Sequence, residues 1–188
     1  GQAPFADTVP DGYGALQTQN LPAAPIKTGT DGFRALTGAG ADILAIAQGT
    51  NNTGTNWNPD VNTGFTNGLW WIKDMVNSNQ HQLVDSVRGG NLALQTPASG
   101  AETAYLAPAG DSVAWCWKAG GAAVTNNDGT IESQVSANTD AGFSIVSYTG
   151  TGANATVGHG LNSAPEMIIF KNRDANAFWA VYHKDIAS

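Results

Sequence analysis

Hydrophobic and polar positions form their clearest pattern near the end of the chain, over residues 142–182. β-branched and aromatic residues are dense over 143–148 and again over 166–171, and Pro165 precedes the second run. A polar segment over 172–176 separates that run from a third, over 178–182. Such runs, bounded by glycine, proline and asparagine, are typical of β-strands. The pattern predicts antiparallel strands here, with the last two runs forming a hairpin.

A weaker form of the same pattern occurs earlier, in the sequence GLWWIKDMVNSNQHQLV of residues 68–84. When Lys73 is placed beside Lys171, residues 70–72 fall on residues 168–170. A polar turn follows in both copies, and the next strands end near Val84 and Val181, one residue out of step. This similarity predicts a duplicated hairpin unit, 68–84 and 166–182, although two diverged copies are too few for a solenoid.

Further strands are expected elsewhere, and no long helix is found. The expected strands lie around 33–36, 92–94, 113–118, 122–125 and 131–136. Asp128-Gly129 is the strongest turn signal, since this dipeptide favours the positive φ angles of a tight hairpin turn between the last two. Residues 40–48 (GADILAIAQ) fit a buried strand or a short helix, because periodicity does not separate the two at this length. We interpret them as a strand.

Residues 113–118 (VAWCWK) predict a central strand with two different faces. Alternation places Trp115 and Trp117 on one face and Cys116 on the other. Cys116 is the single cysteine, so an intrachain disulfide is excluded, and we expect a buried structural thiol rather than a nucleophile. The residues expected to pack between two sheets are Trp115, Trp117, Phe143, Ile145, Ile168, Phe170 and Trp179.

The first 27 residues are expected to form an extended arm, followed by a β-sandwich domain over 28–188. Four prolines lie between residues 4 and 25, which excludes a regular helix there. Regularly spaced apolar residues in this arm suggest that it lies along a surface, either a neighbouring subunit or its own sandwich as an edge-protecting strand. Residues 49–68 form a long loop rich in Asn, Thr and Gly. Loops of this length are either functional or disordered.

Charge and composition exclude several classes of function. The formal net charge is −7, and the eight basic residues are scattered singly. Nucleic-acid affinity depends largely on clustered basic side chains, so no nucleic-acid partner is expected. No apolar run approaches a membrane span, and no signal peptide is recognised, so membrane insertion is not expected either.

The sequence predicts no enzyme. Glycosidases need two carboxylates that flank the scissile bond, but the only glutamates, Glu102, Glu132 and Glu166, lie in separate segments. Each of the three histidines is alone in its segment, and no G-x-S-x-G motif occurs. We therefore expect no catalytic residues.

Two kinds of binding site remain open, one for calcium and one for a glycan. Asn126, Asp128 and Asp140 are weak calcium candidates, because loop Asn and Asp side chains supply oxygen ligands; turns also prefer these residues for backbone reasons, so we expect no metal or other cofactor by default. Trp57 with Asn58 and Asp60 has the composition of a glycan site, an aromatic residue among polar groups. The alternative is that Trp57 anchors its loop to the sandwich.

Several phrases of the sequence resemble a known family. These are PDGYGALQTQNLPAAPI, HQLVDSVRGG, VAWCWKAGG and GFSIVSYTGTGANATVGHGLNSAPEMIIFKNR. They are similar to virion structural or tail-fibre proteins of tailed phages of marine bacteria and cyanobacteria, which carry concanavalin-like or SPRY-like β-sandwich modules. The loop 49–68 and the shortened segment 96–110 depart from the family pattern, so a reduced jelly roll or two half-sandwiches are alternatives to a full sandwich.

The resemblance implies a non-enzymatic virion protein, made in the host cytoplasm and carried on the extracellular particle. We expect a fibre or appendage component that attaches to a host-surface glycan. The alternative is a capsid or tail decoration protein that acts only through protein contacts, and a secreted lectin or glycosidase is the remote third reading. Other virion proteins are the expected partners, and a homo-oligomer is expected.

Overall fold

The chain folds into antiparallel β-sheets, and no helix occurs among the residues that the computed structural model describes, 32–38 and 65–186. Every pairing between named strands is antiparallel. Outside these strands, one isolated parallel bridge joins Ile131 and Val157 in the described ranges. The architecture is all-β and consistent with a β-sandwich, as the sequence predicted. No helix in the described ranges is long and apolar enough to cross a membrane.

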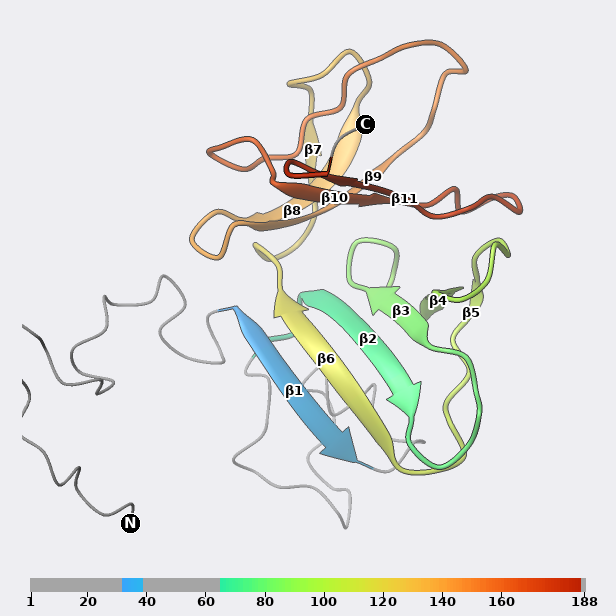
Figure 1. Ribbon diagram of the computed structural model, residues 1–188. Helices are drawn as coiled ribbons and strands as arrows, with labels where there is room; N and C mark the ends of the chain where they lie inside the picture. Colours follow the sequence, from blue (N-terminus) through green and yellow to red (C-terminus); the bar gives the residue numbers. More distant parts are fainter. Residues whose placement is uncertain (1–31, 39–64, 187–188) are drawn as a thin grey trace, which may run out of the picture.

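The first half of the described chain forms a six-stranded sheet (Figure 1). Its strand order is β1-β6-β2-β3-β4-β5, so the last long strand is inserted between the first two. The bounds are β1 Phe33–Gly38, β2 Gly68–Asp74, β3 Gln82–Asp85, β4 Leu92–Gln95, β5 Thr103–Ala104 and β6 Ser112–Lys118. β6 pairs with β1 on one side and with β2 on the other, which makes it a central strand.

The second half contains two smaller sheets, which lie above the first sheet in Figure 1. One has the order β7-β8-β9, with β7 at Val124–Asn126, β8 at Ser133–Asn138 and β9 at Phe143–Tyr148. The other is the hairpin of β10, Met167–Phe170, and β11, Ala180–His183. The runs over 143–148, 166–171 and 178–182 were therefore predicted as strands to within two residues at their ends.

The main core lies on one face of the six-stranded sheet. Burial alternates along β2 and β6, because side chains of successive strand residues point to opposite faces. The buried cluster consists of Leu36, Phe65, Trp70, Ile72, Val84, Ala93, Ala114 and Cys116. Small residues of β6 thus lie beside the large Trp70 and Ile72 of β2, and the Trp70 side chain is 1% exposed.

The expected orientation of β6 was wrong. Ala114 and Cys116 belong to the core face, whereas Trp115 and Trp117 lie half-buried on the opposite face. Trp117 packs there against Phe33, at 5.1 Å between ring centroids. Among the seven expected core residues, Ile145 alone is buried, and Phe170 is exposed. Large aromatic side chains were assumed to mark the core, but here they cover the outer face while Trp70 and small β6 residues fill the interior.

The turn between β7 and β8 also differs from the expectation. Neither Asp128 nor Gly129 has a positive φ angle. Instead the side-chain oxygen of Asn126 accepts a hydrogen bond from the Asp128 backbone N–H at 3.0 Å, an Asx turn. Gly129 is needed for space, because a Cβ there would lie 2.3 Å from the Thr156 carbonyl oxygen.

The hairpins β2–β3 and β10–β11 share one register. Trp70 lies opposite Val84, and Ile168 lies opposite Tyr182, so the sequence shift that carries Trp70 to Ile168 also carries Val84 to Tyr182. The apparent one-residue offset near Val181 therefore disappears. The hydrogen bonds of the two turns are equivalent too. Asp74 Oδ1 accepts from the backbone N–H groups of residues 76 and 77, and Asn172 Oδ1 accepts from those of residues 174 and 175.

Three expectations fall outside the described residues. They are the extended arm over 1–27, the strand over 40–48 and the loop over 49–68, of which only the end is described.

Candidate functional site

The structure describes some of the predicted ligand residues and not others. Trp57, Asn58 and Asp60 lie outside the described residues. Asn126 and Asp128 are adjacent, since the Asn126 amide donates to Asp128 Oδ2 at 2.8 Å. Asp140 lies in the turn at the opposite end of β8, roughly 16 Å away by the length of that strand. The three calcium candidates are therefore not brought together.

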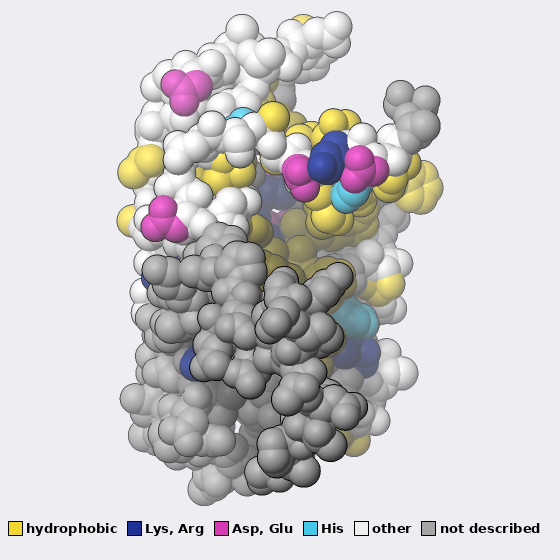
Figure 2. All heavy atoms as spheres, turned by 60° about the vertical axis from the view of Figure 1, so that its left-hand side comes forward, with side chains coloured by type: hydrophobic (Ala, Val, Ile, Leu, Met, Phe, Trp, Pro, Cys, Tyr) yellow, Lys and Arg dark blue, Asp and Glu magenta, His cyan; other side chains and the backbone are white. Residues whose placement is uncertain are grey.

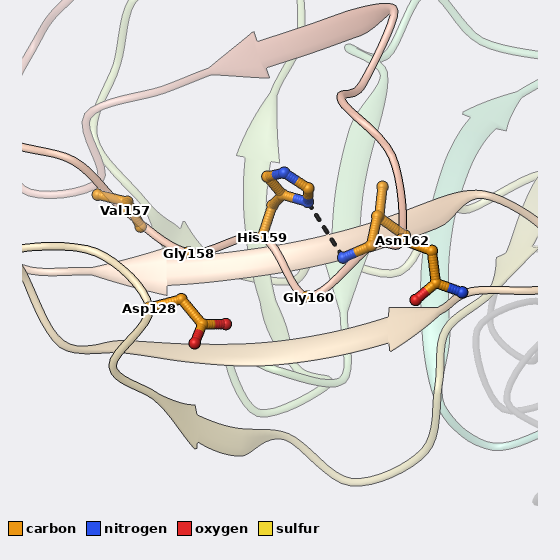
Figure 3. A pocket seen from close by; sticks show the side chains of 7 residues that line it. Asp128, Val157, Gly158, His159, Gly160 and Asn162 are labelled. Atoms are coloured by element: carbon orange, nitrogen blue, oxygen red, sulfur yellow. Dashed lines mark hydrogen bonds between the residues drawn. The ribbon is translucent and has the colours of Figure 1, made fainter.

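A shallow hollow lies beside Asp128 and is lined by residues 157–162 (Figure 3). His159 Nδ1 accepts a hydrogen bond from the Leu161 backbone N–H at 3.0 Å, drawn as the dashed line in Figure 3. This bond fixes the loop, since the ring closes a local turn instead of facing a carboxylate partner. No group of three or more His, Cys, Asp or Glu side chains in the described ranges has the geometry of a metal site.

Cys116 and His81 have structural surroundings. Burial raises the pKa of the Cys116 thiol to about 12, so the thiol stays protonated at neutral pH, and its expected burial is confirmed. His81 Nδ1 accepts a hydrogen bond from Trp71 Nε1 at 2.8 Å, and the ring stacks on Trp115. Partial burial, with the nearby charge of Lys73, lowers the pKa of His81 and favours the neutral ring that this bond requires.

A chain of charged side chains joins the two halves of the molecule. Arg88 is bonded to Asp85 and to Glu102 Oε1, the latter at 2.6 Å. Arg173, which lies just after β10, donates two hydrogen bonds to the same Glu102 carboxylate, from Nε to Oε1 at 3.1 Å and from Nη2 to Oε2 at 2.8 Å. Burial of the Glu102 carboxyl raises its pKa, but hydrogen bonds from Arg173 and Arg88 outweigh this effect, and the net shift is downward. Glu102 therefore acts as a fixed anion that anchors the hairpin.

Backbone bonds reinforce this anchor. The Glu102 N–H donates to the Arg173 carbonyl at 2.8 Å, and the Ala177 N–H donates to the Ser99 carbonyl at 2.9 Å. Trp179 Nε1 donates to the Ala98 carbonyl at 3.1 Å. The β10–β11 turn is thus held by the segment 95–102, whereas the strands of the hairpin extend beyond it.

The strands β10 and β11 expose apolar side chains on both faces. In strand geometry Met167, Ile169 and Val181 share one face, and Ile168, Phe170 and Tyr182 share the other. Phe170 is 44% exposed and Tyr182 is 49% exposed, although their equivalents in the first hairpin, Ile72 and Val84, are both 0% exposed. Figure 2 shows hydrophobic side chains gathered around a small charged group in the upper half of the molecule.

This hairpin is the strongest candidate for a functional surface, and its exposure was not predicted. The dense apolar run over 166–171 was interpreted as core, which is the ordinary meaning of such a run. The sequence signal that distinguishes it is the absence of alternation: both faces of β10 are apolar, so each face needs a cover.

The fold and this surface define an all-β protein with an exposed apolar hairpin, β10–β11. Residues 106–188 match the model of a family described as a domain of unknown function, DUF7483. The matched span includes the central strand β6 and the whole second half. No match was found among curated proteins or among solved structures.

Proposed function

We propose that this chain is a non-enzymatic structural protein of a tailed-phage virion, and that contacts with neighbouring protein subunits hold it in the particle. The observation that carries the proposal is the β10–β11 hairpin, which exposes apolar side chains on both faces. Contiguous apolar patches on a soluble protein mark interaction sites. The phage assignment rests on the phrase-level resemblance of the sequence.

The acidic side chains support a structural rather than a catalytic role. Hydrogen bonds within its turn hold the pKa of Asp74 well below its usual range, and Arg173 and Arg88 lower that of Glu102. A general acid needs the opposite shift, toward neutral pH. These carboxylates serve as turn and anchor groups.

Within a virion, we favour a fibre or appendage component that attaches to a host-surface glycan, with Trp57, Asn58 and Asp60 as the residues for sugar binding. A decoration protein that contacts only capsid or tail subunits is the second candidate, and the exposed hairpin favours it. The two roles differ in whether a host surface is needed.

Gold-labelled antibodies against the chain, imaged on purified phage particles, test the virion role. We expect label at a defined position on the particle, and uniform absence of label from intact and opened particles would contradict the proposal. Binding of the fluorescent protein to host cells separates the two roles. A fibre component should bind, and Trp57→Ala should weaken the binding; a decoration protein should show no cell binding with either variant.

A further inference from the structure

β2 and β10 occupy equivalent places in their hairpins, but they have different neighbours. β2 lies between β3 and β6, and pairs with both. β10 pairs only with β11, and its other edge has no strand partner within the described ranges. The first sheet therefore shows what a strand at the open edge of β10 would look like.

The direction of the backbone groups identifies the open edge. The Lys184 N–H donates to the Glu166 carbonyl at 2.8 Å, as the Ser86 N–H does to Gly68 at 3.0 Å. Because hydrogen-bonded and non-bonded pairs alternate along an antiparallel ladder, the N–H and C=O groups of Met167 and Ile169 point away from β11. In the first hairpin the equivalent groups of Leu69 and Trp71 point toward β6.

The side chains of β10 suit a partner with the pattern of β6. In the first sheet, Ala114 and Cys116 present small side chains beside Ile72 and Trp70 on the core face. The equivalent positions in β10 carry Phe170 and Ile168, so a strand in the register of β6 would place its small residues beside them. Aromatic residues of β6 cover the opposite face, where Trp115 contacts Trp71.

Charge at one end of the edge matches the same partner. Glu166 stands where the first hairpin has Gly68, and the residue opposite Gly68 is Lys118. A strand with the β6 sequence, placed in the equivalent register, would bring its lysine opposite Glu166, as a second cation beside Lys184, which already pairs with this carboxylate at 2.8 Å. Opposite charges in a direct cross-strand pair are favourable.

The β10 edge is protected only at its ends. Exposed edges are normally blocked by short strands, charged residues or proline. β10 is short, with Pro165 and Glu166 before it and Lys171 after it, but the strand itself has the sequence MIIF without charge or proline. These four apolar residues leave backbone groups with which another short strand can pair.

We propose that the free edge of β10 accepts one antiparallel β-strand from another protein chain, and that this strand alternates small residues with aromatic ones as β6 does. The inference rests on the proposed function in one respect, that the donor is a neighbouring subunit of the assembly. Such strand addition draws affinity from main-chain hydrogen bonds and selectivity from alternate side chains.

A synthetic peptide with the sequence of residues 111–119, DSVAWCWKA, tests the proposal in reducing buffer. Fluorescence anisotropy of the labelled peptide measures its binding to the isolated chain. A control peptide of the same composition, DSVWAWCKA, moves the aromatic residues to the other face. We expect saturable binding of the first peptide and at least about tenfold weaker binding of the second, which corresponds to losing one well-packed polar or apolar contact.

Two proline variants locate the binding edge. Ile169 and Val181 form one cross-strand pair, and the N–H groups of both point outward, on opposite edges of the hairpin. Ile169→Pro removes a donor from the β10 edge, and Val181→Pro is the matched control on the β11 edge. Proline is tolerated at such outward positions. We expect at least tenfold weaker peptide binding for Ile169→Pro and unchanged binding for Val181→Pro.

Three results would overturn the proposal: equal binding of both peptides, equal loss in both proline variants, or no binding by a monomeric chain. A dimer that Ile169→Pro dissociates would also overturn it, since a second copy would then occupy the edge; light scattering detects this outcome. The virion role is tested separately by antibody labelling of particles. A negative result in the peptide-binding experiment therefore does not affect the interpretation of the labelling experiment, or the reverse.

Discussion

The hairpins β2–β3 and β10–β11 have the same register and the same turn, but opposite surroundings. Ile72 and Val84 are completely buried, whereas Phe170 and Tyr182 at the equivalent places are nearly half exposed. Local features, such as the Asx turn that follows each first strand, therefore set the hairpin geometry in both copies. Burial is decided by the strands and segments that pack around the hairpin.

Truncation of a large side chain should separate the two hairpins most strongly. We expect Trp70→Ala to lower the free energy of unfolding by roughly 3 to 5 kcal/mol, because it opens a cavity in the core. Phe170→Ala should cost less than about 1 kcal/mol, since its side chain is already exposed. Urea denaturation followed by circular dichroism measures both. Similar losses in the two variants would show that the second hairpin is packed as tightly as the first.

Glu102→Gln should have the next largest effect, because it removes the anion that joins the hairpins. Arg88 would then keep a buried charge with fewer partners, at a cost of roughly 2 to 4 kcal/mol. Lys184→Met is the control, since it removes an exposed ion pair with Glu166 and should change stability by less than about 1 kcal/mol. An effect of Glu102→Gln no larger than that of the control would contradict the anchoring role.

Acid should weaken the same anchor. The pKa of Glu102 is lowered in the folded state, so its contribution to stability is complete above the ordinary value of 4.5 and is lost as pH falls below it. Urea midpoints should therefore fall between about pH 5 and pH 3, and they should fall less steeply in Glu102→Gln. Parallel slopes in both proteins would show that other carboxylates carry the acid sensitivity.

The two turns offer a smaller comparison. The Asp74 carboxylate accepts hydrogen bonds from two backbone N–H groups and from the amides of Asn77 and Asn79, whereas the Asn172 side-chain oxygen accepts the two equivalent backbone bonds. We expect Asp74→Ala to lower the thermal midpoint more than Asn172→Ala. Equal shifts in differential scanning calorimetry would mean that the side-chain amides contribute little.

Sequence reasoning located strands better than it located their partners. The runs that became β6, β9 and β10 were recognised from local residue pattern, which also determines local backbone geometry. The prediction that Trp115 and Trp117 lie on the core face of β6 was wrong, because the size of an aromatic side chain was taken as a sign of burial. Whether a face is covered depends on segments distant in the sequence, and no local pattern contains that information.

The candidate surface was missed for the same reason. β10 was interpreted as core from its apolar density, and its open edge is seen only because the part of the chain that the structure describes places no third strand beside it. The cross-sheet anchor at Glu102 was missed because its partners Arg88 and Arg173 come from separate segments. The buried thiol of Cys116 was foreseen, since an isolated cysteine in a strand is usually a core residue.

Amide hydrogen exchange of the monomeric chain tests the central claim most directly, because it compares equivalent backbone groups in the two hairpins. The Trp71 N–H points toward β6 and should exchange slowly, whereas the Ile169 N–H points from the open edge and should exchange about as fast as an unprotected amide. Addition of the β6 peptide should then slow exchange at Ile169. Equal protection of the two amides in the free monomer would contradict an open β10 edge.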